Sequence, residues 1–192
     1  MHLIKDSLAF IFVAATLTGC GDDPASAESG TGDTLLPAPA PVVSNCGDTG
    51  FLNARLSGAI DTELNWSAGS LRCESMLRPD DRGVRLRFSG DVAGERLAII
   101  IAMPELEAGA TGPEFDSVVT VTAEGTGRFF STANLGSCWT EVRGNTAQGD
   151  EEGLYVVSGT LSCVAPLGEF NGSAFIDIRE LQFSGVADWS ET

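Results

Sequence analysis

The residue types that can do chemistry are unevenly represented in this chain of 192 residues. Its only histidine is His2 and its only lysine is Lys5, whereas Asp and Glu together number 27. Ser-His-Asp triads, Cys-His pairs, His-ligated zinc and Schiff-base lysines each need a histidine or a lysine. Beyond residue 5, any catalysis would therefore have to use carboxylates, Tyr155, backbone groups or a carboxylate-bound metal.

Two groups of carboxylates stand close together in predicted turns. Asp150, Glu151 and Glu152 follow one another in a predicted hairpin loop, and Asp80 and Asp81 form the second group. Oxygen ligands suit calcium, but the spacing of the first group matches no calcium-loop template. Both groups are typical of solvated turns. Paired carboxylates can also hydrolyse a glycosidic bond, but no sequence feature selects two of them. We expect no metal, no cofactor and no catalytic residue.

Four cysteines lie beyond residue 45, at Cys46, Cys73, Cys138 and Cys163. None of them forms a C-x-x-C motif, so the spacing does not favour a zinc site or a thioredoxin-like role. In an oxidising compartment an even set indicates two disulfides, for which three pairings are possible. We favour Cys46 with Cys73 and Cys138 with Cys163, because each pair encloses a local β segment.

The chain is strongly acidic, with a formal net charge of −16 and arginine as its only cation beyond Lys5. An acidic surface repels nucleic acid, so we expect no nucleic-acid partner. High charge also keeps a protein soluble where salt screens its self-repulsion, so a saline habitat is one explanation. Replacement of lysine by arginine in a GC-rich genome is the other.

The first twenty residues have the form of an export signal. A charged start precedes a mostly apolar run over residues 7–16, and the next four residues are Leu17-Thr18-Gly19-Cys20. The apolar run is shorter than the roughly 20 residues that cross a bilayer. The four residues resemble a bacterial lipobox, so the segment is similar to the signal of a bacterial lipoprotein. An ordinary signal peptide with a coincidental cysteine is the alternative.

The resemblance implies that residues 1–19 are a signal peptide that is removed. It further implies that Cys20 carries a diacylglycerol thioether and an acylated amino terminus, such as palmitate. Several acyl chains anchor stably where one chain is marginal. Residue 21 is glycine, not the aspartate of an inner-membrane retention signal, which favours the outer membrane. The resemblance thus implies a protein anchored to a membrane of the cell envelope through Cys20, facing the periplasm or the cell surface.

The rest of the chain divides by composition into a spacer and a domain. Residues 20–45 contain Cys20, which the resemblance implies is lipidated, and a stretch rich in Pro, Gly and Ser, with prolines at 24, 37, 39 and 41. Such a stretch is typical of a disordered spacer with extended polyproline II segments. Residues 46–192 are long enough for one domain with a single core.

Alternation of apolar and polar residues with a period of two runs through residues 46–192 and predicts strands. The segment over residues 97–103 is apolar on both faces and is expected to be a central strand. No stretch predicts a long helix. We expect an all-β fold, namely a β-sandwich of about eight antiparallel strands, with a closed up-and-down β-barrel as the alternative. Residues 157–163 are also similar in style to strands of uncharacterised β-sandwich lipoproteins, which implies no activity.

A five-residue pattern recurs four times. It consists of an apolar residue, Ser, Gly, any residue and a second apolar residue. Its glycines are Gly58, Gly90, Gly159 and Gly185. An inward glycine in a strand marks a bend, a bulge or the close approach of a bulky neighbour. Trp66 and Trp189 are in phase with these faces and are candidates to fill the space. The alternative is that the glycines line a ligand cavity.

Three functions remain compatible with these observations. The one we favour is a non-enzymatic, lipid-anchored ectodomain that binds a protein, a glycan or a small molecule. A carrier of lipids or small molecules with an interior cavity is the first alternative, supported by the inward glycines. A hydrolase that uses carboxylates is the second. A fold class does not by itself decide among them.

Overall fold

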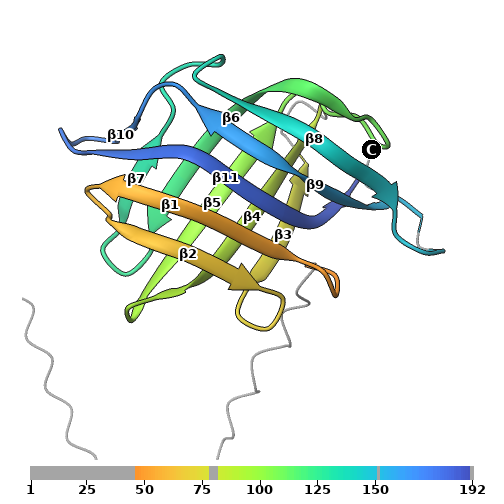
Figure 1. The fold of residues 1–192 in the computed structure, drawn as a ribbon, viewed down its shortest axis with the longest axis horizontal. Helices are drawn as coiled ribbons and strands as arrows, with labels where there is room; N and C mark the ends of the chain where they lie inside the picture. The colour runs from red at the N-terminus through yellow and green to blue at the C-terminus, as the bar shows by residue number, and fades with distance from the viewer. Residues whose placement is uncertain (1–45, 78–81, 151, 191–192) are drawn as a thin grey trace, which may run out of the picture. The chain divides into compact units, whose positions relative to one another are not determined.

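In the computed structural model, the residues described are 46–77, 82–150 and 152–190. They form eleven β-strands and no helix (Figure 1). The predicted signal peptide and spacer, including Cys20, lie outside the described residues. The strands are β1 (Phe51–Gly58), β2 (Thr62–Ser67), β3 (Arg72–Leu77), β4 (Val84–Val92), β5 (Glu95–Met103), β6 (Gly112–Ala123), β7 (Arg128–Ser131), β8 (Cys138–Ala147), β9 (Leu154–Cys163), β10 (Leu167–Glu169) and β11 (Phe175–Asp188).

All the strands belong to one antiparallel sheet, in the order β2-β1-β11-β10-β7-β6-β5-β4-β3. The two longest strands, β6 and β11, have 12 and 14 residues and each changes partner along its length. The first half of β6 pairs with β8 and the second half with β7. The start of β11 pairs with β10 and the remainder with β9. Two routes of paired strands therefore join β6 to β11, one through β8 and β9 and one through β7 and β10.

The sheet folds over itself, so that its two halves face each other across one core. Figure 1 shows β1, β2, β9 and β11 in front of β3, β4 and β5. The all-β prediction is confirmed. The described residues contain eleven strands rather than about eight, and the two faces of the expected sandwich belong to one continuous sheet. The long strands β6 and β11 account for this continuity because each is shared by neighbouring parts of the sheet.

The alternation of the sequence sets which side chains enter the core. In β5 the inward side chains of Leu97, Ile99, Ile101 and Met103 are all buried. Its outward residues Ala98 and Ala102 are buried as well, and β5 lies between β4 and β6, as expected for a central strand. Burying a large aliphatic side chain contributes about 1.5–3 kcal/mol, so this strand is a main source of stability.

Two of the recurrent glycines lie against large aromatic rings from the opposite half of the sheet. A Cβ at Gly90 in β4 would lie 2.7 Å from the indole of Trp66 in β2. A Cβ at Gly185 in β11 would lie 2.9 Å from the ring of Phe88 in β4. The ring of Phe88 also packs on Phe183, with centroids 5.7 Å apart. The glycines therefore make room for rings, and Trp66 fills the space as the sequence suggested.

The other two recurrent glycines meet backbone. A Cβ at Gly159 would lie 2.3 Å from the carbonyl oxygen of Glu141 on the paired strand β8. Gly58 ends β1 with a φ of +104°, where a side chain would be strained. Trp189 packs on Tyr155, with ring centroids 5.3 Å apart. Close packing thus explains Gly90, Gly159 and Gly185, and backbone conformation explains Gly58.

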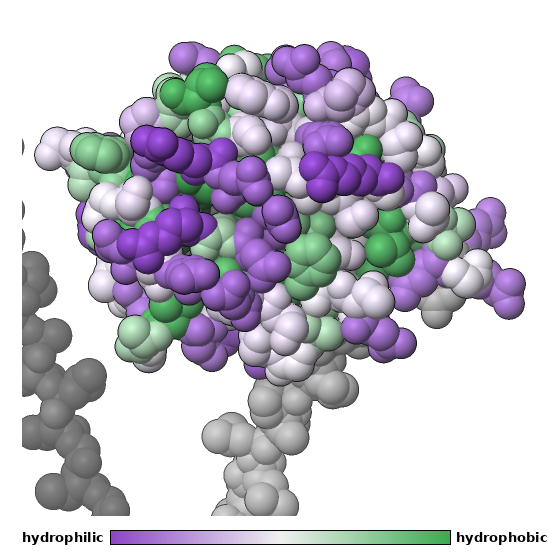
Figure 2. All heavy atoms as spheres, viewed as in Figure 1, coloured by the Kyte–Doolittle hydropathy of each residue, from purple (hydrophilic) through white to green (hydrophobic). Residues whose placement is uncertain are grey.

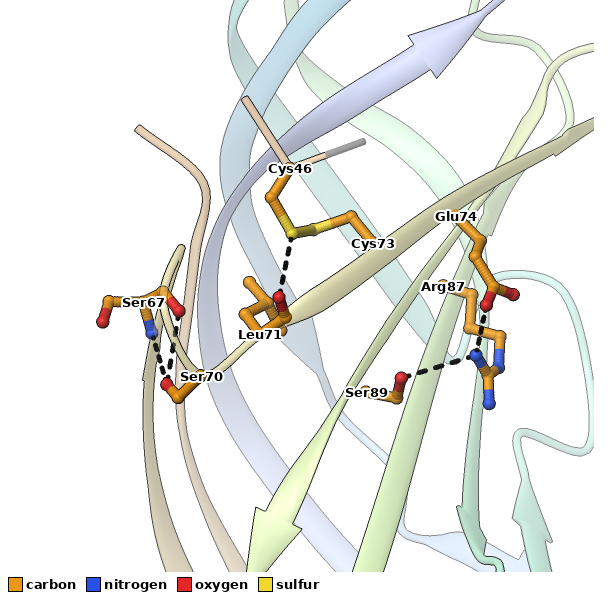
Figure 3. Close-up of a disulfide and its surroundings, with 8 residues drawn as sticks. All are labelled: Cys46, Ser67, Ser70, Leu71, Cys73, Glu74, Arg87 and Ser89. Atoms are coloured by element: carbon orange, nitrogen blue, oxygen red, sulfur yellow. Dashed lines mark hydrogen bonds and ion pairs between the residues drawn. A yellow bond between two sulfur atoms is a disulfide. The ribbon is translucent and has the colours of Figure 1, made fainter. Parts of the chain in front are cut away.

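Both favoured disulfides are present. Cys46 is bonded to Cys73, across a Cα separation of 4.9 Å, and this bond ties the start of the domain to β3 (Figure 3). Cys138 is bonded to Cys163, which lies directly opposite it in the pairing of β8 with β9. The bonds span 27 and 25 residues, so each closes a local loop as the sequence indicated.

We expect Gly90→Ala to destabilise the domain by about 1–3 kcal/mol, because its methyl group would overlap the Trp66 indole. Urea unfolding monitored by circular dichroism measures the change. Gly168→Ala is the matched control, since no atom lies within 4 Å of a Cβ there. Equal unfolding midpoints for the two variants would show that Trp66 does not pack on Gly90.

Candidate functional site

Two of the five carboxylates singled out in the sequence, Asp150 and Glu152, lie among the described residues. Asp150 and Glu152 are exposed in the turn between β8 and β9. Glu151, Asp80 and Asp81 lie outside the described residues. Within residues 46–77, 82–150 and 152–190, no group of three or more His, Cys, Asp or Glu side chains is placed to hold a metal ion.

Several other carboxylates pair with arginines across neighbouring strands. Arg87 on β4 lies 3.1 Å from Glu74 on β3 and also donates a hydrogen bond to Glu124 just after β6. Arg96 approaches the same Glu124 carboxylate, at 3.6 Å. Figure 3 shows Arg87 directed toward Glu74, and both side chains are partly exposed, at 19% and 42%. These arginines and carboxylates therefore have a structural role on the outer surface.

The most distinctive surface feature is a group of three exposed phenylalanines, which we call the aromatic face. Phe129, Phe170 and Phe175 are 40%, 71% and 53% exposed. They come from β7, from the residue after β10 and from the start of β11. Gly168 lies between these strands, opposite Phe175 on one side and Ser131 on the other. A phenylalanine has no polar group to satisfy in water, so exposed clusters of them commonly mark interaction sites.

The first two rings of the aromatic face are in contact. Phe129 and Phe170 pack edge to face, with centroids 6.3 Å apart and an interplanar angle of 81°. The backbone N–H of Phe170 donates to the carbonyl of Phe129 at 2.8 Å. Their backbones are therefore joined directly, and the two rings are presented together.

An ion pair holds the turn that carries Phe170. The Nε–H of Arg128 donates to Oε1 of Glu169 at 2.7 Å, and this joins β7 to β10 next to the two rings. The Arg128 guanidinium also lies 5.0 Å from the centroid of the buried Phe130 ring, in a cation–π arrangement. Arg128 directly precedes Phe129, and Glu169 directly precedes Phe170. The ion pair therefore joins the backbone segments that carry the two exposed rings.

The turn after Phe170 is equally constrained. Asn171 has a φ of +59°, a left-handed conformation that asparagine tolerates better than most residues. At Gly172 a Cβ would lie 2.2 Å from Oε2 of Glu169, so the carboxylate occupies the place of a side chain. The N–H of Glu169 donates to the carbonyl of Ala174 at 2.9 Å. Glu169, Asn171 and Gly172 therefore each suit the conformation of this turn.

The hydrogen bond from Arg128 lowers the pKa of the Glu169 carboxyl below its ordinary value. A lowered pKa in the folded state means that the contribution of the ion pair to stability is complete above the ordinary pKa of glutamate. It is lost as the pH falls through the folded-state pKa. The turn that presents Phe170 is therefore held at neutral pH and weakened in acid.

Apolar exposure continues beyond the aromatic face. Every second residue from Phe170 back to Val164 is exposed, and Val164 itself is 73% exposed. The N–H of Val164 donates to the carbonyl of Ser137, close to Leu135, which is 58% exposed. In Figure 2 hydrophobic atoms lie at the end of the domain that carries β10, among hydrophilic ones.

Sequence reasoning missed the aromatic face. Phe129 and Phe130 are adjacent, so alternation in a strand places one side chain inward and the other outward. The pattern does not determine which of the two is exposed. The partnership of Arg128 with Glu169 joins residues 41 positions apart, which no local pattern reports. One sequence signal could have indicated the aromatic face. Val164, Gly168 and Phe170 are non-polar and fall on one side of a period-two pattern, and Leu167, which is buried, falls on the other.

A scan against protein-family models finds no match for this chain, and searches of curated proteins and of solved structures also find none. The described residues define an all-β domain with two disulfides. Because disulfides persist in oxidising compartments, they indicate an extracytoplasmic environment. Among the described residues, no helix is long and apolar enough to cross a membrane.

We expect Gly172→Ala to raise the pKa of Glu169 toward its ordinary value, because the new methyl group would displace the carboxylate from Arg128. Carboxyl carbon shifts followed by NMR against pH measure this. Glu141 is the internal control: its pKa is lowered by a hydrogen bond from Arg143 on β8, and its titration should not change. An unaltered Glu169 titration would show that the backbone of the turn moves to accept the methyl group, while the carboxylate keeps its hydrogen bond to Arg128.

Proposed function

We propose that this protein is a non-enzymatic, lipid-anchored ectodomain of the bacterial cell envelope, and that it binds a partner protein through the aromatic face. The observation that carries the proposal is the set of three exposed phenylalanines, two of them fixed by hydrogen bonds and an ion pair. Exposing such rings in water is unfavourable unless a partner covers them. Fixing them before binding lowers the entropy lost when a partner docks.

The position of the aromatic face supports this function. The described chain enters the domain at Cys46, and Gly47 lies near Val186 in the last part of β11. From there β1 runs antiparallel to β11 until Gly58 pairs with Ile176, beside Phe175. Eight residues of strand span about 26 Å. The aromatic face therefore lies at the far end of the domain from residue 46, where a tethered domain would present it to other molecules.

The chemistry of the surface favours a protein over a small ligand. Phenylalanine has no hydrogen-bonding group with which to orient a sugar or a metabolite, but its ring suits an apolar pocket on another protein. The net charge of −16 favours a basic partner, since complementary charge accelerates association and selects partners. The interior offers less support for a carrier, because Phe88, Phe130 and Phe183 are fully buried in the core.

The anchor is tested at the cysteine of the lipobox-like segment. We expect Cys20→Ser to move the protein from the membrane fraction to the soluble fraction of cells and to abolish incorporation of labelled palmitate. Cys46→Ser is the control, because it removes a cysteine of the domain and leaves Cys20 in place. Labelling that persists in Cys20→Ser would contradict the lipid anchor and favour an ordinary signal peptide.

The binding surface is tested first by site-specific photo-crosslinking in cells. A benzophenone amino acid at position 170 should give one discrete protein adduct, whereas the same group at Arg179, whose side chain is 90% exposed on β11, should not. An adduct with the mass of two copies of this chain would mean self-association and would contradict the proposed partner.

The purified partner then allows affinity to be measured. We expect Phe170→Ser and Phe129→Ser each to weaken binding by about 1–3 kcal/mol, roughly 5- to 150-fold, through lost apolar burial. Arg179→Ala should leave the affinity unchanged, and added salt should weaken binding to a basic partner. Equal affinities for the wild type and both phenylalanine variants, in folded protein, would refute the proposal.

A further inference from the structure

A groove lies at the other end of the domain, away from the aromatic face. Its volume is about 290 Å³, and it is lined by Arg82 and Gly83 just before β4, by residues 104–108 after β5 and by Trp189 after β11. Three segments that are far apart in the sequence thus meet around one hollow. Its volume is just below the range for small-molecule sites, about 300–1,000 Å³, so it suits a small group rather than a large ligand.

The loop over residues 104–108, which forms one wall, is fixed by contacts with the core and with β8. Leu106 is fully buried in the core and fixes the middle of the loop. The side-chain amide of Asn145 on β8, itself buried, donates to the carbonyls of Glu107 and Ala110 at 2.8 and 2.9 Å. A Cβ at Gly83 would lie 2.1 Å from the carbonyl oxygen of Met103 and 2.5 Å from that of Pro104, so the chain just before β4 packs closely on the start of the loop. The wall is therefore formed before any ligand arrives.

The aromatic wall is fixed as well. The backbone N–H of Trp189 donates to the carbonyl of Gly153 at 2.9 Å. Its indole packs edge to face on Tyr155 with an interplanar angle of 85°. Both contacts come from β9 and the turn before it, so the indole is supported on a rigid element.

The lining is negatively charged next to an aromatic ring. Glu105 and Glu107 flank the buried Leu106 and are both exposed, and among the described residues that line the groove Arg82 is the one cation. The two carboxylates thus outnumber the cation, in a molecule with a formal net charge of −16. An indole face attracts cations through its quadrupole, and carboxylates attract them directly. The indole and the two carboxylates therefore both favour a positively charged ligand.

We propose that the Trp189 groove binds an organic cation, through an alkylammonium or guanidinium head group. Trp189 contacts the head group, and Glu105 and Glu107 balance its charge. The ligand is either a free small molecule or the side chain of a lysine or arginine. This site is separate from the aromatic face, and neither site needs the other.

The test uses the exported, disulfide-bonded protein and two probes, tetramethylammonium and ethylguanidinium, at constant ionic strength. NMR should show saturable shifts of the Trp189 indole N–H and of the amides of residues 105–108. A double variant, Glu105→Gln with Glu107→Gln, should weaken binding at least 10-fold. The matched control is Glu114→Gln with Asp116→Asn, which removes the same charge from two exposed carboxylates on β6 and should change the affinity little.

A capped Gly-Arg-Gly peptide separates the two sources of the head group. Tighter binding of the peptide than of ethylguanidinium indicates a protein side chain, and the reverse indicates a free molecule. Non-saturable shifts spread over exposed carboxylates, equal losses in the two double variants, or tighter binding of uncharged methyl glucoside would each overturn the cation site. The Phe170→Ser variant should bind the probes normally, so failure here and failure of the proposed function are distinguishable.

Discussion

The fit of aromatic rings into glycine-lined space between the two halves of the sheet is the contact on which the structure depends. Phe88 meets Phe183 and the bare backbone of Gly185, while Trp66 covers Gly90 near the edge of the sheet. A folded-over sheet keeps its halves about 10 Å apart, a distance that large rings fill only where the facing residue is small. At Gly90 and Gly185 the recurrent Ser-Gly pattern is therefore a requirement of packing against aromatic rings.

Much of the domain was predictable because its causes are local. Alternation identified the inward faces of β4 and β5, and the separations of the cysteines indicated Cys46 with Cys73 and Cys138 with Cys163. The folding of the sheet was not predictable, because it arises where β6 and β11 exchange one partner for another. The short strands β7 and β10, of four and three residues, are too brief to show a period.

The candidate sites were less accessible still, because each is assembled from distant residues. Arg128 and Glu169 belong to different strands, and Trp189, Glu105 and Arg82 come from three segments far apart in the sequence. A carboxylate looks the same in sequence whether it faces solvent or holds a turn. What distinguishes Glu169 from Glu152 is a partner and a glycine that leaves it room, and both become visible only in three dimensions.

The Cys46–Cys73 bond has a mechanical consequence. Any force that arrives along the chain at residue 46 divides at once between the backbone leading into β1 and the covalent bond into β3. These strands lie near opposite edges of the sheet and pair with different neighbours, so the load is shared between two sets of hydrogen bonds. A pull on an untied end would peel one strand at a time. Here the first strand cannot be drawn away without straining the other edge, so the domain resists tension from the side on which a tether would act.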